Sequence, residues 1–398
     1  MPSLALTTRT LAASWVITLA FIGAAAAQDP ASSAVEIRGE VHGLILMNAF
    51  ANDEAVNNSD VPQFVLPPAA PGGPPASAAG ATVRQSRVTA TALVQDFAGG
   101  QLTGELDVDV FGGQQPSTGG RTFPLVRLRR AFAVFDRGRI TVFAGQEAPP
   151  IAEINPSSLA SIGIPEFAGA GNLWLWIPQV RVGLRAGTIG AVRIGLEGSV
   201  LAPTSGDAQT AFFTQPDIAE RSSRPYVQGR LRLRWGAGDE LGEVSLGGHY
   251  GWLAVGPGRR VSSRALVAGV WTPIVRGVEL RGEAYVGRAL AGLGGGGIGQ
   301  NFGIDSAAVE TAGGWAQLNV RPSAAWEIGA GAGLDDPDDA DLVVAVQRLR
   351  NMAIEGHVSW RRAPIVLGAE VRLLRTRYGG SVGTVEATHL NLAAGFEF

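Results

Sequence analysis

The chain has 398 residues, of which 46% are hydrophobic and only 17% are charged, with 55 glycines and a formal net charge of −3. This charge argues against a strongly basic nucleic-acid-binding protein, and the lack of cysteine excludes disulfides, thiol nucleophiles and cysteine-bound zinc. Beyond the N-terminal segment, no apolar run approaches the ~20 residues of a membrane helix. The hydrophobicity is instead spread by alternation, which is typical of β-structure.

The N-terminal segment has the pattern of a secretory signal peptide. Arg9 precedes an apolar stretch over 11–22, which is followed by the small residues Ala24 to Ala27 and then Gln28. A positive region, a short apolar region and a small-residue cleavage motif together indicate export. We therefore expect residues 1–27 to be a cleaved signal peptide and residues 28–398 to form a single domain.

Alternating apolar and polar residues follow along most of the chain. In the segment 227–235, for example, apolar residues and one glycine on one face oppose a polar face of Gln228, Arg230, Arg232 and Arg234. An apolar face against a charged face fits a wall between lipid and water. Strands of this kind are predicted at 34–48, 83–95, 101–112, 125–136, 139–147, 178–187, 191–200, 225–236, 242–253, 263–272, 277–288, 313–321, 325–334, 347–360, 365–376 and 387–398.

Short and long connections alternate between these strands. The short ones are rich in Gly, Pro or Asp, as tight turns are. The longer ones lie near 49–82, 113–124, 148–177, 201–224, 254–262, 289–312, 335–346 and 377–386. An antiparallel up-and-down barrel of about 16 strands places all long loops at one end and all short turns at the other. The fold class predicted is therefore an all-β transmembrane barrel of the bacterial outer membrane.

The polar faces of these strands are the candidate lining of a pore. Because an arginine facing lipid at mid-membrane costs ~2–4 kcal/mol, arginines on alternating positions are expected to face water inside the barrel. Guanidinium groups favour anions and bind carboxylates in a planar geometry. The pore-lining residues predicted are Arg127, Arg129, Arg181, Arg185, Arg193, Arg230, Arg232 and Arg234, with Glu105, Asp107 and Asp109. Alternatively, Arg127 and Arg129 pair with these three acids on the adjacent hairpin and only balance charge.

The segment 148–177 follows the fifth predicted strand and is a candidate constriction loop. Glu147 precedes it, Glu153 and Glu166 lie within it, and an apolar Leu-Trp-Leu-Trp run closes it. An ordinary surface loop is the alternative. The four histidines show no metal-ligand spacing, and we predict no cofactor or metal; the acidic run at 335–341 suits a solvated loop tip, with calcium as the less favoured reading.

The last strand alternates apolar residues from Leu390 to the terminal Phe398, as the assembly signal of outer-membrane proteins does. Several segments also resemble the DcaP-like trimeric porins: Arg84-Gln85-Ser86-Arg87, the acidic strand at 105–112, the residues at 127–131 with Gly145-Gln146, and Trp176-Ile177-Pro178-Gln179-Val180-Arg181. This resemblance implies a sixteen-stranded, trimeric, passive channel with dicarboxylate-type anions as cargo. That family carries a periplasmic coiled-coil segment, which we do not expect between Gln28 and the first strand.

The function predicted is a diffusion channel for small hydrophilic solutes, favouring anions such as carboxylates. Its partners would be outer-membrane lipid and lipopolysaccharide, two further copies of the chain and small anionic solutes, but no nucleic acid. Two alternatives remain open. One is a barrel enzyme of the phospholipase or protease type, although the four histidines show no obvious spacing to a catalytic partner. The other is a plugged structural or adhesin barrel.

Overall fold

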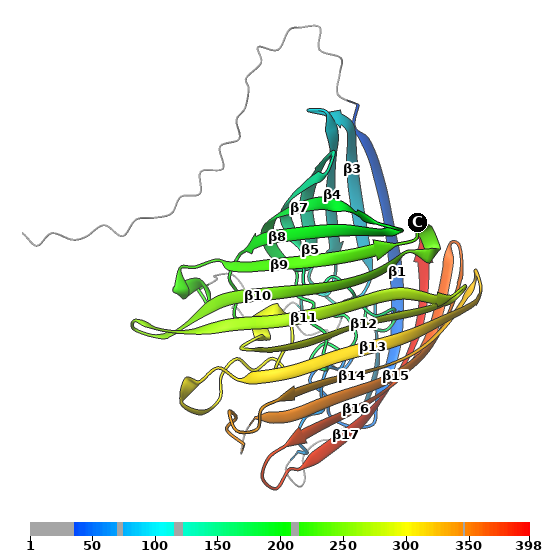
Figure 1. The fold of residues 1–398 in the computed structure, drawn as a ribbon. Coiled ribbons are helices and arrows are strands. Elements are labelled where there is room, and N and C mark those ends of the chain that lie inside the picture. Colours follow the sequence, from blue (N-terminus) through cyan, green and yellow to red (C-terminus); the bar gives the residue numbers. More distant parts are fainter. Residues whose placement is uncertain (1–35, 70–74, 115–121, 208–214, 345–346) are drawn as a thin grey trace, which may run out of the picture. The chain divides into compact units, whose positions relative to one another are not determined.

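The computed structural model describes residues 36–69, 75–114, 122–207, 215–344 and 347–398, and the expected signal peptide lies outside them. The unit formed by residues Ile37–Phe398 is a closed antiparallel sheet (Figure 1). The strands are β1 (Arg38–Asn52), β2 (Ala78–Thr82), β3 (Arg87–Phe97), β4 (Gly100–Asp109), β5 (Arg127–Arg137), β6 (Ile140–Glu147), β7 (Ile177–Ile189), β8 (Val192–Leu201), β9 (Tyr226–Trp235), β10 (Gly242–Gly256), β11 (Arg259–Val275), β12 (Val278–Arg288), β13 (Glu310–Ser323), β14 (Trp326–Pro337), β15 (Arg348–Arg362), β16 (Ile365–Tyr378) and β17 (Thr384–Glu397).

Each strand pairs with its neighbours in the chain, and β1 closes the ring by pairing with β17. The strands β2 and β3 both pair with β1 and are two parts of one strand, interrupted at 83–86. Counted in this way, the wall has sixteen strands, which confirms the predicted barrel. The only helices in the described part of the chain are four short 3-10 turns: η1 (Glu220–Ser222), η2 (Gly238–Glu240), η3 (Ala291–Leu293) and η4 (Ile304–Ser306). No helix there is long and apolar enough to cross a membrane.

The predicted strands match the observed ones in number and order, and one loop prediction is wrong. The segment 254–262 was expected to be a long loop, but β10 ends at Gly256 and β11 begins at Arg259. Pro257 and Gly258 alone form the turn, and Gly258 has a φ of +71°. Pro-Gly is a tight-turn sequence, so this hairpin needs no further residues. The long loop expected at 49–82 is also shorter, because β1 continues to Asn52 and β2 starts at Ala78.

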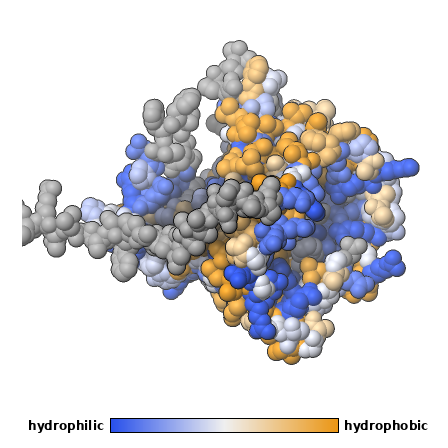
Figure 2. Space-filling model, turned by 90° about the horizontal axis from the view of Figure 1, so that it is seen from above, coloured by the Kyte–Doolittle hydropathy of each residue, from blue (hydrophilic) through white to orange (hydrophobic). Residues whose placement is uncertain are grey.

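The wall is apolar outside and polar inside, the reverse of a soluble domain. In β16, Val371 and Leu373 are 41% and 51% exposed, whereas Glu370 and Arg372 are 6% and 1% exposed. Since strand side chains alternate between faces, charged residues point into the ring and aliphatic ones out of it. Figure 2 shows large hydrophobic areas on the surface of the molecule, interrupted by groups of hydrophilic side chains.

Candidate functional site: a loop across the lumen and an arginine-rich passage

The loop between β6 and β7, residues 148–176, runs through the interior of the ring. The Ser157 backbone N–H donates to Gln317 Oε1 of β13 at 2.7 Å, and the Ser157 carbonyl accepts from Gln317 Nε2 at 2.9 Å. The Ser158 hydroxyl donates to Glu370 Oε2 of β16 at 2.6 Å. Further round the ring, at the interruption between β2 and β3, Gln85 Oε1 accepts backbone N–H bonds from Ile162 and Gly163 at 2.7 and 2.9 Å. The loop therefore crosses the lumen from β6 and is attached to strands on the far side of the ring.

Apolar contacts hold this loop against the wall formed by β10 to β16. The ring of Phe167 stacks on Trp315 of β13 with centroids 5.9 Å apart. Leu173 packs with Leu290 and Leu293 of the connection between β12 and β13, and Trp174 N–H donates to the Leu293 carbonyl at 2.9 Å. The glycine-rich stretch near 292–299 is thus packed against the loop at 148–176, although its composition suggests a flexible surface loop.

Glycine is required where the loop backbone meets β13. Gly171 has a φ of +100°, and a Cβ at this position would lie 2.2 Å from the Gly314 carbonyl oxygen. We expect Gly171→Ala to lower the free energy of unfolding by about 1–3 kcal/mol, as overpacking does. Gly169→Ala is the matched control, because Gly169 also has a positive φ (+73°) but its nearest neighbour would be 3.8 Å away. Urea unfolding followed by tryptophan fluorescence measures the stability of both variants. Equal losses of unfolding free energy would contradict the close contact between Gly171 and Gly314.

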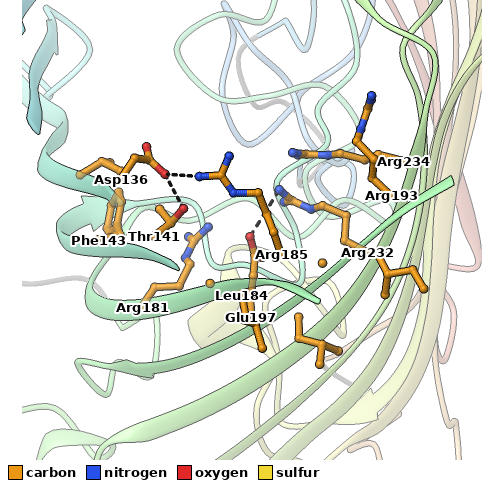
Figure 3. A pocket seen from close by; sticks show the side chains of 15 residues that line it. Asp136, Thr141, Phe143, Arg181, Leu184, Arg185, Arg193, Glu197, Arg232 and Arg234 are labelled. Atoms are coloured by element: carbon orange, nitrogen blue, oxygen red, sulfur yellow. Dashed lines mark hydrogen bonds and ion pairs between the residues drawn. The ribbon is translucent and has the colours of Figure 1, made fainter. Parts of the chain in front are cut away.

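Two cavities lie beside the loop: the smaller one is bordered by β5 to β9, and the larger one by the loop and by β1, β3, β5, β6, β7, β15 and β17. One has a volume of about 900 Å³ and the other about 420 Å³, and Val134, Phe143 and Arg181 border both of them. Figure 3 shows the smaller cavity, with Arg181, Arg185, Arg193, Arg232 and Arg234 around it and Asp136 and Glu197 between them. Together the two cavities are bordered by nine arginines and five Asp or Glu side chains. The lining of this passage is therefore positively charged.

The predicted pore-lining residues divide into two groups. Six of the arginines border a cavity: Arg129, Arg181, Arg185, Arg193, Arg232 and Arg234. Arg127, Arg230, Glu105, Asp107 and Asp109 face inward but border neither cavity, because partners cover them. Of the constriction-loop candidates, Glu147 and Glu153 border the larger cavity. Glu147 is the last residue of β6, and Glu166, which belongs to the loop, is buried against Arg372.

On β4 and β5, the structure has the charge pairing that the sequence left as an alternative. Arg127 Nη2 lies 2.5 Å from Asp109 Oδ2, and Arg129 Nε lies 3.4 Å from Asp107 Oδ1. Arg130 pairs with Glu105 and, at 2.8 Å, with Glu147. These acids neutralise part of the basic wall, so the net positive charge of the passage comes mainly from β7, β8 and β9.

Inward-facing arginines outside the predicted pore-lining set include Arg87, Arg130, Arg361 and Arg372. The first three border the larger cavity. Arg130 was missed because of a β-bulge: Asp107 pairs with Arg130 while Val108 pairs with Leu128, so the extra residue Arg129 leaves two consecutive arginines facing inward. Arg372 could have been found, since it continues the inward parity of Glu370 on β16.

Arg372 joins the loop to β16. Its Nε lies 3.0 Å from Glu166 Oε1 and its Nη2 lies 2.7 Å from Glu370 Oε1. Burial, with Glu370 beside it, raises the pKa of the Glu166 carboxyl well above its ordinary value, and Arg372 opposes this shift. Because Glu166, Glu370 and Arg372 are buried, water does not solvate their charges, and these side chains must neutralise one another by pairing.

One group of side chains has the chemistry of metal ligands among the residues described. Glu355, His357 and Glu370 offer atoms within 4.8 Å of one another. However, Glu370 accepts from both Arg372 and Ser158, and Glu355 accepts from Gln317 Nε2 at 2.8 Å. We assign no metal to this group. The acidic run at 335–341 is not a simple solvated tip either, because Asp335 is buried and accepts the Ile298 N–H at 2.8 Å.

No family model matches the sequence, and no curated protein matches it. Solved structures do share the fold. The outer membrane channel DcaP of Acinetobacter baumannii superposes with a TM-score of 0.67 at 15% identity, over 92% of this chain and 99% of the other. An anion-selective porin from Comamonas acidovorans gives a TM-score of 0.58 at 13% identity, over 91% and 100% of the two chains. The in-vitro folded outer membrane protein OmpT of Vibrio cholerae, described as a trimer form, gives 0.53 at 9% identity, over 91% and 99%.

Proposed function

We propose that this chain is an outer-membrane porin: a passive diffusion channel for small hydrophilic solutes that favours anions such as carboxylates. The observation that carries the proposal is the lining of the two cavities, in which nine arginines face five acidic side chains. A positive, water-filled passage lowers the electrostatic barrier for anions and raises it for cations. An aliphatic outer surface supports a barrel that sits in lipid.

Three further parts belong to the same proposal. Residues 1–27 direct export and are cleaved after Ala27. The outer surface binds outer-membrane lipid and lipopolysaccharide. The chain assembles as a homotrimer, which is supported by the likeness to a porin-fold structure described as a trimer. Cross-linking in detergent tests the trimer, since it would yield a limiting species of three chains.

Planar-bilayer recording tests the channel directly. Under a KCl gradient, the purified protein is expected to give stable conductance steps and a reversal potential of the sign that chloride permeation produces. A cation-selective reversal potential would leave the channel but remove the anion preference. An absence of steps would favour the plugged barrel, and hydrolysis of a phospholipid or peptide substrate would favour the enzyme.

The triple substitution Arg185→Gln, Arg193→Gln and Arg234→Gln tests the charge argument. All three residues border the smaller cavity, and their removal leaves six arginines against five acids. We therefore expect the anion-to-cation permeability ratio to fall to near one. The matched control is Arg259→Gln, Arg260→Gln and Arg375→Gln, which removes the same charge from residues that border neither cavity. A similar fall in the control would contradict the assignment of selectivity to the lining.

A further inference from the structure

Three arginines hold the carboxylate of one loop residue. Glu153 Oε2 lies 2.6 Å from Arg230 Nη2 of β9, and it also accepts from Arg232 of the same strand. Its other oxygen, Oε1, accepts from Arg181 of β7. We call Arg181, Arg230 and Arg232 the guanidinium cradle. Three charge-assisted bonds to one carboxylate form the kind of site that recognises a carboxylate ligand.

The cradle is held in place by contacts that do not involve Glu153. Arg181 Nη2 donates to the Ala148 carbonyl at 3.0 Å, and its guanidinium lies over the Phe143 ring. Arg230 Nε donates to Glu197 Oε2 at 2.9 Å. Arg232 Nε lies 3.0 Å from Glu243 Oε1. The three guanidinium groups are therefore positioned in advance, as a binding site requires.

Glu153 is the exposed member of the assembly. Its side chain is 26% exposed, whereas those of Arg181, Arg230 and Arg232 are 10%, 2% and 10% exposed. Glu153 belongs to the loop and borders the larger cavity, while Arg232 borders the smaller one and Arg181 borders both. The cradle thus lies where a solute passes from one cavity to the other.

We propose that Glu153 is a tethered counter-ion that fills a carboxylate-binding site in the free channel, and that a solute carboxylate binds by replacing it. This inference rests on the proposed anion channel. Exchange keeps the number of charged hydrogen bonds constant, so the solute enters and leaves without leaving the three arginines one carboxylate short. Conduction needs such weak binding, because with Glu197 and Glu243 alone as counter-ions the three arginines would keep a net positive charge and hold an anion tightly.

The attachment of Glu153 to the loop sets the affinity with which a solute carboxylate binds the cradle. A carboxylate held on a chain segment competes at an effective concentration on the order of millimolar. Removing this competitor with Glu153→Gln is expected to lower the dissociation constant for succinate roughly tenfold. Other loop attachments, among them Ser157 to Gln317 and Ser158 to Glu370, remain in the variant.

Titration calorimetry on the detergent-solubilised protein measures this, with succinate as the probe and uncharged succinamide as the comparison. Tighter succinate binding by Glu153→Gln, with no gain for succinamide, supports the proposal. The matched control is Asp136→Asn, which removes the same charge from the cavity lining but lies outside the cradle. An equal gain in this control, or no gain in Glu153→Gln, overturns it. Glu153→Asp, whose shorter side chain reaches the cradle less well, is expected to be intermediate.

The two proposals fail separately. If the wild-type protein shows no steps or prefers cations in the bilayer while calorimetry gives the expected gain, the channel proposal fails and the cradle remains a carboxylate site. If the wild-type protein is an anion-preferring channel but Glu153→Gln binds succinate as the wild type does, only the exchange at the cradle fails.

Discussion

Arg372→Leu is expected to lower the free energy of unfolding by about 3–5 kcal/mol, the range for breaking a buried ion pair by removing one partner. Arg372 is 1% exposed and donates to Glu166, Glu370, the Ser161 hydroxyl at 2.6 Å and the Pro62 carbonyl at 3.0 Å. Leucine leaves two buried carboxylates without a counter-charge. It also removes one of the attachments of the loop at 148–176 to β16, so open-channel current should become noisier in bilayer recordings.

Arg375→Leu, on the same strand, is the control for this substitution. Its guanidinium lies 2.9 Å from Glu386, but the two side chains are 58% and 65% exposed, so the loss should stay below about 1 kcal/mol. Adding Glu166→Gln and Glu370→Gln to Arg372→Leu should recover part of the stability, because the uncompensated charges are then gone. Urea unfolding gives all three values. Equal losses for Arg372→Leu and Arg375→Leu would show that the buried pairing does not stabilise the loop.

Val371→Arg, one residue away, is expected to destabilise the barrel by about 2–4 kcal/mol in lipid, the depth-dependent range for arginine near the bilayer midplane. Val371 lies in the middle of β16 and points outward, where its neighbours Leu367 and Leu373 are 44% and 51% exposed. The arginine would meet hydrocarbon rather than water. Unfolding titrations in phospholipid vesicles measure the loss.

Ile365→Arg is the depth control. Ile365 also points outward and is 40% exposed, but it is the first residue of β16. Near the interface an arginine costs only about 0–1 kcal/mol. If Val371→Arg and Ile365→Arg lower the free energy of unfolding equally, the outer wall of β16 does not face a bilayer of the expected depth. The membrane assignment would then have to be abandoned.

The sequence alone determined the fold class and the face of each regular strand. Because strand side chains alternate with a period of two, the run from Val227 to Arg234 assigns its arginines to one face, and the structure buries Arg230 while leaving Leu231 38% exposed outside. Turn composition likewise located the short connections, but several strands extend beyond their predicted ends, and Pro257 and Gly258 alone form a turn where a long loop was predicted.

The tertiary structure decided which arginines remain available to solutes. The bulge at Arg129 reverses the parity of β5, and no local pattern announces it. Glu153 meets Arg230 across 77 residues of sequence, and Glu166 meets Arg372 across 206. Such contacts depend on the closure of the ring and on the path of the loop inside it. The two-residue period encodes only the face on which a side chain lies, so it cannot tell a paired arginine from one that borders the passage.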